Sequence, residues 1–219
     1  GLAIAVGVVL LTLAAGRAAT AERPQVSVVL TGQSLLQSDL RVDNPDAVAA
    51  LRPLLEGDVM FTDFETTVRK PGDSLADLDP VGGVYGPPEA VDALKDLGFN
   101  LLALSNNHAY DIGQIGVLNT LDRVKAAGIA HAGTGLTLDE ASAPGYLRIG
   151  DAKVALVSMA TGLIRPGAFA GAQRPGVNEL HLVGGTPGVD AGSPKPQDSA
   201  RILASIRRAS HTADLVIAY

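Results

Sequence analysis

The side chains best suited to chemistry lie in three short clusters, each of which follows an apolar run. In the densest cluster, SNNHAYD at residues 105–111, Asn107, His108 and Asp111 place an amide, an imidazole and a carboxylate close together. An imidazole titrates near neutral pH and acts as a general acid or base when a carboxylate orients it, so Asp111 is the candidate partner of His108. Amide and carboxylate oxygens also bind hard divalent cations. The alternative is a structural role, with an asparagine capping the next helix and the histidine packed beneath it.

The other two clusters offer one carboxylate and one amide as candidate ligands. Glu65 lies in DFETTV at 63–68 and Gln33 in TGQSLL at 31–36. A lone glutamate at a strand end is often solvated surface, and a glutamine there can simply cap or bond the backbone, so both structural alternatives stay open. The chain has no cysteine, which excludes disulfides, thiolate zinc sites and cysteine nucleophiles.

Alternating strands and helices are expected to position these clusters. We predict strands at 26–31, 58–62, 100–105, 129–132 and 214–218, a hairpin of 146–149 with 153–159, helices at 44–55, 89–97, 115–127 and 198–209, and loops at 69–86 and 160–197. The first strand, VSVVLT, is apolar throughout and is predicted to be buried on both faces. This alternation predicts an α/β fold with a mainly parallel sheet covered on both faces, and ligands at the carboxyl ends of its strands.

The first 21 residues have the composition of an export signal. An apolar run of about 15 residues precedes Arg17 and the small-x-small sequence Ala19-Thr20-Ala21, and it is short for a membrane span of about 20 residues. An uncleaved N-terminal anchor is the alternative. The chain carries a net charge of −6 and no long basic run, which argues against a nucleic-acid partner. We therefore expect an exported protein that is periplasmic, extracellular or anchored at the cell envelope.

The motif N-N-H-A-x-D-x-G, followed by a helix and A-G-I-x-x-x-G-x-G, is the most specific pattern in the chain. Together with TGQSLL and DFETTV it resembles the bacterial capsule and poly-γ-glutamate synthesis family of CapA type, over about residues 26–219. The domain of that family is similar to the calcineurin-like metallophosphoesterases. The resemblance implies a two-sheet sandwich flanked by helices, with metal ligands at the carboxyl ends of strands.

The resemblance also implies roles for the candidate residues. Asn107 and Glu65 would ligate a divalent metal, Mn²⁺, Mg²⁺ or Zn²⁺, while His108 would protonate the leaving oxygen or stabilise the transferring phosphoryl group. Gln33 departs from the family, which usually has Gly-Asp at this strand end. A carboxamide in place of a carboxylate removes one negative charge from the metal site and would weaken it.

A second departure is that the later histidine ligands of the family do not occur in this sequence. His131, His181 and His211 are expected to be structural or surface residues rather than substitutes. The run DLVIAY at 214–219 resembles the strand that leads to the first of those ligands. We therefore expect residues 22–219 to be the N-terminal part of a metallophosphoesterase-like domain in a longer protein, and to retain metal poorly.

The implied function is the synthesis, anchoring or release of an anionic envelope polymer such as poly-γ-glutamate capsule. The intact protein would then be a metal-dependent, phosphoesterase-like hydrolase, with the polymer or a phosphoester as substrate and a membrane-bound biosynthetic complex as a further partner. One alternative is a non-catalytic, polymer-binding module on the same fold. Another is a sugar-phosphate or nucleotide hydrolase of the envelope unrelated to capsule.

Overall fold

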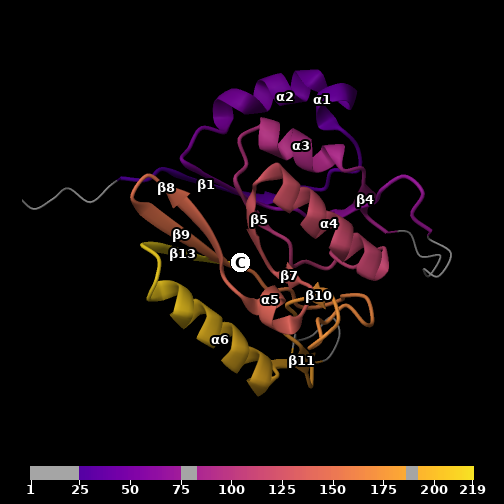
Figure 1. Ribbon diagram of the computed structural model, residues 1–219, viewed down its shortest axis with the longest axis vertical. Helices are drawn as coiled ribbons and strands as arrows, with labels where there is room; N and C mark the ends of the chain where they lie inside the picture. The colour runs from indigo at the N-terminus through magenta and orange to yellow at the C-terminus, as the bar shows by residue number, and fades with distance from the viewer. Residues whose placement is uncertain (1–24, 75–82, 186–191) are drawn as a thin grey trace, which may run out of the picture.

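Two β-sheets pack face to face between layers of helices (Figure 1). The computed structural model describes residues 25–74, 83–185 and 192–219, so the expected export segment at 1–21 lies outside the described residues. The first sheet is parallel, in the order β1 (Val28–Gln33), β2 (Val59–Asp63), β5 (Leu101–Ala103) and β6 (Ala130–Ala132). The second has the order β13 (Leu215–Ala218), β9 (Ala152–Val157) and β8 (Gly145–Ile149), with β13 parallel to β9 and β8 antiparallel to it.

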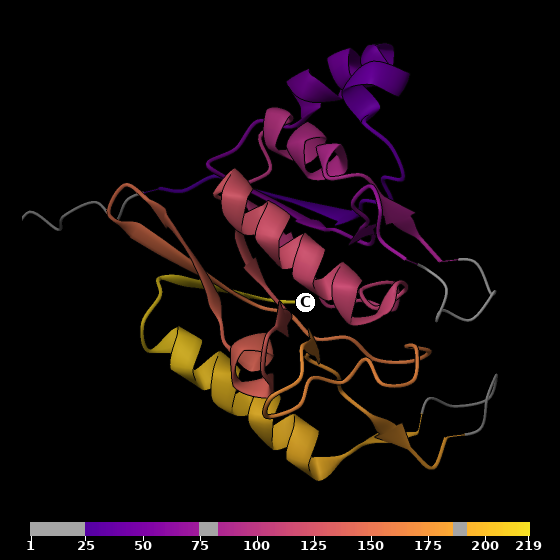
Figure 2. The same ribbon diagram turned by 45° about the vertical axis from the view of Figure 1, so that its right-hand side comes forward.

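Helices cover the outer face of each sheet, as the two views in Figures 1 and 2 agree. The first sheet packs against α2 (Pro45–Leu51), α3 (Glu89–Asp96) and α4 (Gly113–Ala127), and α1 (Leu40–Asp43) and the 3₁₀ turn η1 (Arg52–Leu54) flank α2. The second sheet packs against α6 (Pro196–Ser210), where Ala209 contacts Ala155 and Val157. The layers therefore run helix, sheet, sheet, helix.

Alternation along the central strands explains why these apolar runs are buried on both sides. Phe61 and Leu101 join Leu156 in the core between the sheets, whereas the neighbouring Met60 and Leu102 enter the core beneath the helices. Successive side chains of a strand point to opposite faces, so one unbroken apolar run supplies two cores. The predicted α/β class and parallel sheet are confirmed.

The first strand differs from its prediction. β1 runs from 28 to 33 rather than 26 to 31, and the side chain of Leu30 is 61% exposed instead of buried on both faces. Among the described residues β1 pairs with β2 alone, so it is an edge strand, and its register shifts between Leu30 and Gln33. An apolar composition alone does not distinguish an edge strand from a central one.

Helices α3 and α4 end at the predicted glycines, while the predicted loops contain short strands. Gly98 and Gly128 have φ of +98° and +69° just after α3 and α4, the left-handed conformation that ends a helix. Seven short elements of the described chain lie within or beside the predicted loops, or in the segment after β6: β3 (Thr67–Val68), β4 (Tyr85–Gly86), β7 (Thr134–Gly135), α5 (Leu138–Ser142), β10 (Gly176–Val177), β11 (Leu182–Val183) and β12 (Ser193–Pro194). None of the helices in the described ranges is long and apolar enough to cross a bilayer.

Candidate functional site

The three polar clusters meet at the carboxyl edge of the first sheet. β1 ends at Gln33, β2 at Asp63 and β5 at Ala103, just before the NNH turn, and Gln33 pairs in register with Asp63. The serine after β1 holds this edge, because the Ser34 backbone N–H donates to the Asp63 carbonyl at 2.7 Å. Parallel strands thus bring together residues that lie about 75 positions apart in the sequence.

His108 and Asp111 form a tightly hydrogen-bonded pair. Nδ1 of His108 lies 2.7 Å from Oδ2 of Asp111, an almost completely buried carboxylate. That carboxylate also accepts from Nε of Arg165 at 3.0 Å and from the backbone N–H of Val84 at 2.6 Å. An acceptor surrounded by donors fixes the tautomer with the proton on Nδ1, which leaves Nε2 as the reactive atom of the imidazole.

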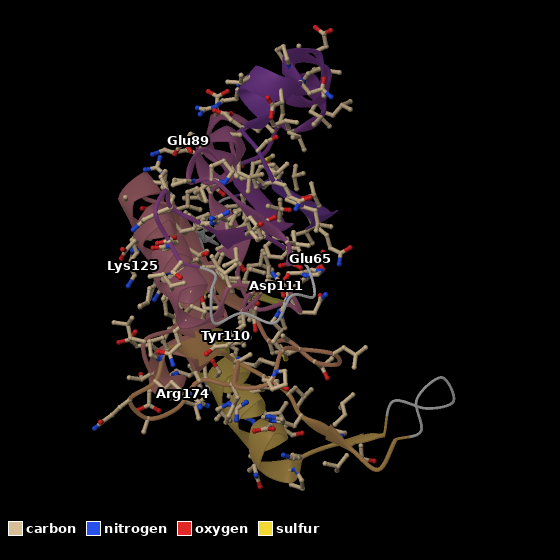
Figure 3. All side chains as sticks on the ribbon, turned by 90° about the vertical axis from the view of Figure 1, so that its right-hand side faces the viewer. Glu65, Glu89, Tyr110, Asp111, Lys125 and Arg174 are labelled. Atoms are coloured by element: carbon tan, nitrogen blue, oxygen red, sulfur yellow. The ribbon has the colours of Figure 1, made fainter. Side chains whose placement is uncertain are left out.

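Glu65 lies on the other side of the same imidazole. Its Oε1 is 3.9 Å from Nε2 of His108, and its side chain is only 4% exposed. Oε2 is buried and has no hydrogen-bond partner among the described residues. Figure 3 shows Glu65 and Asp111 next to each other on one side of the molecule, and His108 contacts both. A buried carboxylate oxygen without a donor is costly, so this atom is placed to bind a proton or a cation.

A second acidic group is buried beside Glu65. Burial raises the pKa of Asp63 to about 6, and the charge of Glu65 adds to the rise, while a hydrogen bond from Asn106 opposes it. Nδ2 of Asn106 donates to Oδ1 of Asp63 at 2.8 Å, and the Tyr219 hydroxyl donates to Oδ2 at 3.4 Å. Burial, followed by the charge of Asp63, raises the pKa of Tyr219. The site therefore concentrates negative charge where water is largely excluded.

The two asparagines of the NNH turn have different environments. Asn106 is buried and fixes the turn, since it donates to Asp63 and to the Phe64 carbonyl and accepts the His108 backbone N–H at 3.1 Å. The next helix, α4, has Ile112 at its N-cap position and no side-chain cap, so Asn106 fixes the turn without capping that helix. Asn107 is half-buried, and its side chain makes no hydrogen bond to the described residues. Its assignment as a metal ligand stays a prediction.

Gln33 lies at the rim of the site rather than inside it. Its side chain is exposed and makes no hydrogen bond within the part of the chain that the structure describes. Its role as a ligand also stays a prediction. Among residues 25–74, 83–185 and 192–219 there is no group of three or more His, Asp or Glu side chains placed to hold a metal ion.

Arg165 is the site residue that the sequence did not reveal. It comes from the segment after β9, where glycines and prolines dominate, and no pattern there connects it with Asp111. Asp63, Asn106 and Tyr219 were visible as residues at strand ends, but their contacts depend on packing between strands and between sheets. A motif identifies the residues on one strand end and leaves out those that other elements contribute.

The remaining histidines have different surroundings, and His181 makes two close contacts with carboxylates. Its Nδ1 lies 2.7 Å from Asp198 of α6 and its Nε2 lies 3.5 Å from Glu179, while Arg201 binds the other oxygen of Asp198 at 2.5 Å. His131 bonds the Ile129 carbonyl through Nδ1 at 3.0 Å, and burial lowers its pKa. The C-cap residue of α6, His211, is exposed.

The amino-acid sequence of this chain is similar to those of known bacterial proteins. Residues 4–219 match the family described as bacterial capsule synthesis protein PGA_cap. The uncharacterized protein y4sH of Sinorhizobium fredii is 39% identical over 109 residues, which cover 46% of this chain and 23% of that protein. The capsule biosynthesis protein CapA of Bacillus anthracis is 31% identical over 88 residues, 40% of this chain and 21% of that protein.

A probable polyglutamine synthesis accessory protein of Mycobacterium tuberculosis is 32% identical over 129 residues, 58% of this chain and 33% of that protein. The chain thus spans between about a fifth and a third of the length of these relatives. The family match, by contrast, covers almost the whole chain, including every residue of the site described above. The chain belongs to the PGA_cap family of bacterial capsule synthesis proteins.

Proposed function

We propose that the protein, as the N-terminal part of a longer exported chain, takes part in the synthesis, anchoring or release of an anionic envelope polymer such as poly-γ-glutamate. The names of two relatives, a capsule biosynthesis protein and a probable polyglutamine synthesis accessory protein, support the polymer. The chemistry we propose is phosphoesterase-like hydrolysis. The observation that carries it is His108 held between Asp111 and Glu65, whose buried Oε2 has no hydrogen-bond partner among the described residues. The two-sheet sandwich flanked by helices is the fold that a metallophosphoesterase-like domain requires.

The residues at the strand ends fit a hard divalent cation. Oε2 of Glu65 is buried without a donor, and the neighbouring Asp63 carboxyl is a second oxygen donor in a site that contains no thiol. Glu65, Asn107 and Gln33 would hold Mn²⁺, Mg²⁺ or Zn²⁺, with further ligands from outside the described residues. The ion would supply an activated water and neutralise phosphoryl charge.

His108 has the geometry of a general acid. Because Nδ1 is held by Asp111, Nε2 is directed to the side of Glu65, where the doubly protonated imidazole can give its Nε2 proton to a leaving oxygen. Asp111 in turn is fixed by Arg165 and by the Val84 backbone N–H, so the imidazole cannot rotate without losing its hydrogen bond to a carboxylate that is itself held in place. Asp111 and Arg165 are thus positioning residues that act through His108.

The test is a pair of substitutions in the intact parent protein, assayed on a generic phosphoester with Mn²⁺. His108→Asn should lower kcat about 10²-fold and leave metal content unchanged, because general-acid catalysis contributes about that factor. Glu65→Gln should lower metal content itself. His211→Asn is the matched control, since this exposed histidine at the end of α6 should change neither quantity. Full activity in His108→Asn would refute the hydrolytic assignment.

The alternative is a non-catalytic module that binds the polymer on the same fold. The observation that favours it is Gln33, a neutral and exposed side chain where the family usually has a carboxylate. Calorimetric titration of Mn²⁺ into Gln33→Asp separates the two functions. Tighter binding or a higher stoichiometry supports the hydrolase, and an unchanged affinity with unchanged stoichiometry supports the binding module.

A further inference from the structure

A cleft of about 440 Å³ opens beside β3 and β4, and none of its lining residues belongs to the His108 site. Arg69 and Lys70 supply two positive charges, Tyr85 an aromatic ring, and Pro71 and Pro87 rigid apolar walls. Gly86 forms part of the floor, where any side chain would collide with the Leu36 carbonyl. The close approach of β4 to the segment after β1 therefore shapes the cleft.

Within the described part of the chain, Arg69 is held in place without a counter-ion. Its guanidinium lies over the Tyr85 ring, 5.3 Å from the ring centroid, and its backbone N–H donates to the Gly86 carbonyl at 2.8 Å. No carboxylate among the described residues pairs with its side chain. A guanidinium stacked on a ring keeps its N–H donors, which lie in its own plane, for a bidentate contact with a carboxylate.

Lys70 provides a second cation that is only weakly engaged. Its Nζ lies 3.2 Å from Asp122 of α4, and both side chains are substantially exposed. An exposed pair of this kind contributes between about 0 and 1 kcal/mol, so a ligand carboxylate can compete for the ammonium group. Among the described residues that line the cleft, Glu89, at the start of α3, is the only acidic one.

We propose that this cleft binds a run of glutamyl units, the carboxylate polymer of the proposed function, on which this inference rests. Carboxylates of successive units would bind Arg69 and Lys70, and the methylene groups between them would pack on Pro71 and Pro87. Each γ-linked glutamyl unit carries one carboxylate and two methylene groups, which suits a cleft lined by both cations and prolines. Glu89 opposes such a ligand, and this sets a limit on its affinity.

The cleft lies close enough to the His108 site to hold the same polymer. Four residue steps connect Glu65 to Arg69 through β3, a distance of at most about 14 Å for an extended chain. Figure 3 shows Glu89, at the cleft, above Glu65 and Asp111. A polymer seated on Arg69 can therefore extend toward Glu65 and His108.

The experiment measures binding of a fluorescent poly-γ-glutamate oligomer to the intact protein by anisotropy, at low salt and with EDTA. Arg69→Ala should weaken binding at least tenfold, and Glu89→Gln should tighten it about two- to fivefold by removing repulsion. Lys125→Ala is the matched control, because it removes one positive charge from the exposed last turn of α4 and should leave affinity unchanged. The assay contains EDTA and reads binding alone, so its outcome does not depend on the proposed metal-dependent hydrolysis.

Three results would overturn the assignment. The first is an equal loss in Arg69→Ala and Lys125→Ala, which would show attraction by overall charge. The second is an unchanged affinity in Glu89→Gln, a variant that keeps the fold even where removal of Arg69 disturbs it. The third is equally strong, Arg69-dependent binding of a polyphosphate of matched charge, which would assign the cleft to phosphate polymers instead.

Discussion

At the scale of single residues, the site depends on one imidazole and the carboxylates on either side of it. The spacing of His108 and Asp111 indicated their partnership, because residues three apart in a helical turn lie on one side of it. The environment of Glu65 could not be inferred in the same way. Its burial and its unpartnered oxygen depend on β5 and the NNH turn, which lie 40 residues later in the chain.

Asp111→Asn tests whether this carboxylate positions His108. The amide can still accept one hydrogen bond, but it carries no charge to hold both Arg165 and the imidazole. We expect kcat of the intact protein to fall about 10- to 100-fold while KM stays unchanged, because substrate binding does not involve Asp111. The measurement is steady-state kinetics with metal content determined in parallel. A changed KM with an unchanged kcat would place Asp111 in substrate binding instead.

At the scale of elements, the NNH turn is held by the packing of α4 on β3. The Thr67 hydroxyl donates to the His108 carbonyl at 2.5 Å, and the Val68 N–H donates to Thr120 of α4 at 2.9 Å. Long helices and strands were predictable because their apolar periodicity extends over several turns or residues. The two-residue strands β3 and β4 were not, since two residues have no period and their pairing is decided by distant parts of the chain.

Gly116→Ala tests this packing. Alanine normally stabilises a helix by up to about 1 kcal/mol relative to glycine, but here its methyl group would collide with the Thr67 side chain. We therefore expect a net loss of about 1–3 kcal/mol in the free energy of unfolding. Urea denaturation measures it, with the exposed Gln114→Ala as a control that stays within about 0.5 kcal/mol. Stabilisation by Gly116→Ala would show that α4 can move away from β3 at little cost.

The cluster around Asp198 ties the segment before β11 to α6. Burial alone would raise the pKa of Asp198, but hydrogen bonds from Arg201 and His181 outweigh it and hold the pKa below its ordinary value of 3.8. A lowered pKa in the folded state means that the stabilisation is complete above pH 3.8 and is lost as the pH falls through the folded value.

Asp198→Asn should therefore destabilise the protein most at neutral pH. We expect a loss of about 3 kcal/mol at pH 7, because the half-buried Arg201 charge loses its buried partner, and a smaller difference from the wild type below about pH 4. Thermal or urea unfolding at pH 3 to 8 measures the difference. Asp122→Asn removes an exposed ion pair and serves as the control. A difference that is constant with pH would rule out an ionic contribution from Asp198.

At the scale of the whole molecule, the two sheets act as one unit through a shared core. Phe61 of the first sheet contacts Tyr219, which follows β13 of the second, with ring centroids 5.2 Å apart. The Tyr219 hydroxyl also donates to Asp63, so the second sheet contributes directly to the site. The apolar runs predicted the strands, and the family resemblance implied two sheets, but which sheet each strand joins depends on contacts between them. Parallel pairing of β13 with β9 connects residues about 60 positions apart.

This organisation predicts how the 219-residue chain responds to a divalent cation. Among the described residues, Glu65 supplies the one buried carboxylate oxygen of the site without a hydrogen-bond partner. A cation held by so few charged ligands keeps most of its water. We expect Mn²⁺ to bind with a Kd of about 0.5 mM, so that 1 mM Mn²⁺ stabilises the folded state by only about 0.6 kcal/mol.

Thermal unfolding with Mn²⁺ or EDTA measures this difference, and Glu65→Gln should abolish it. His211→Asn is the control for weak binding to an exposed imidazole and should keep it. Stabilisation by several kcal/mol that survives Glu65→Gln would mean that the cation binds elsewhere in the chain. The carboxyl edge of the first sheet would then be a site for His108 chemistry without a metal, and the proposed role of Glu65 would be wrong.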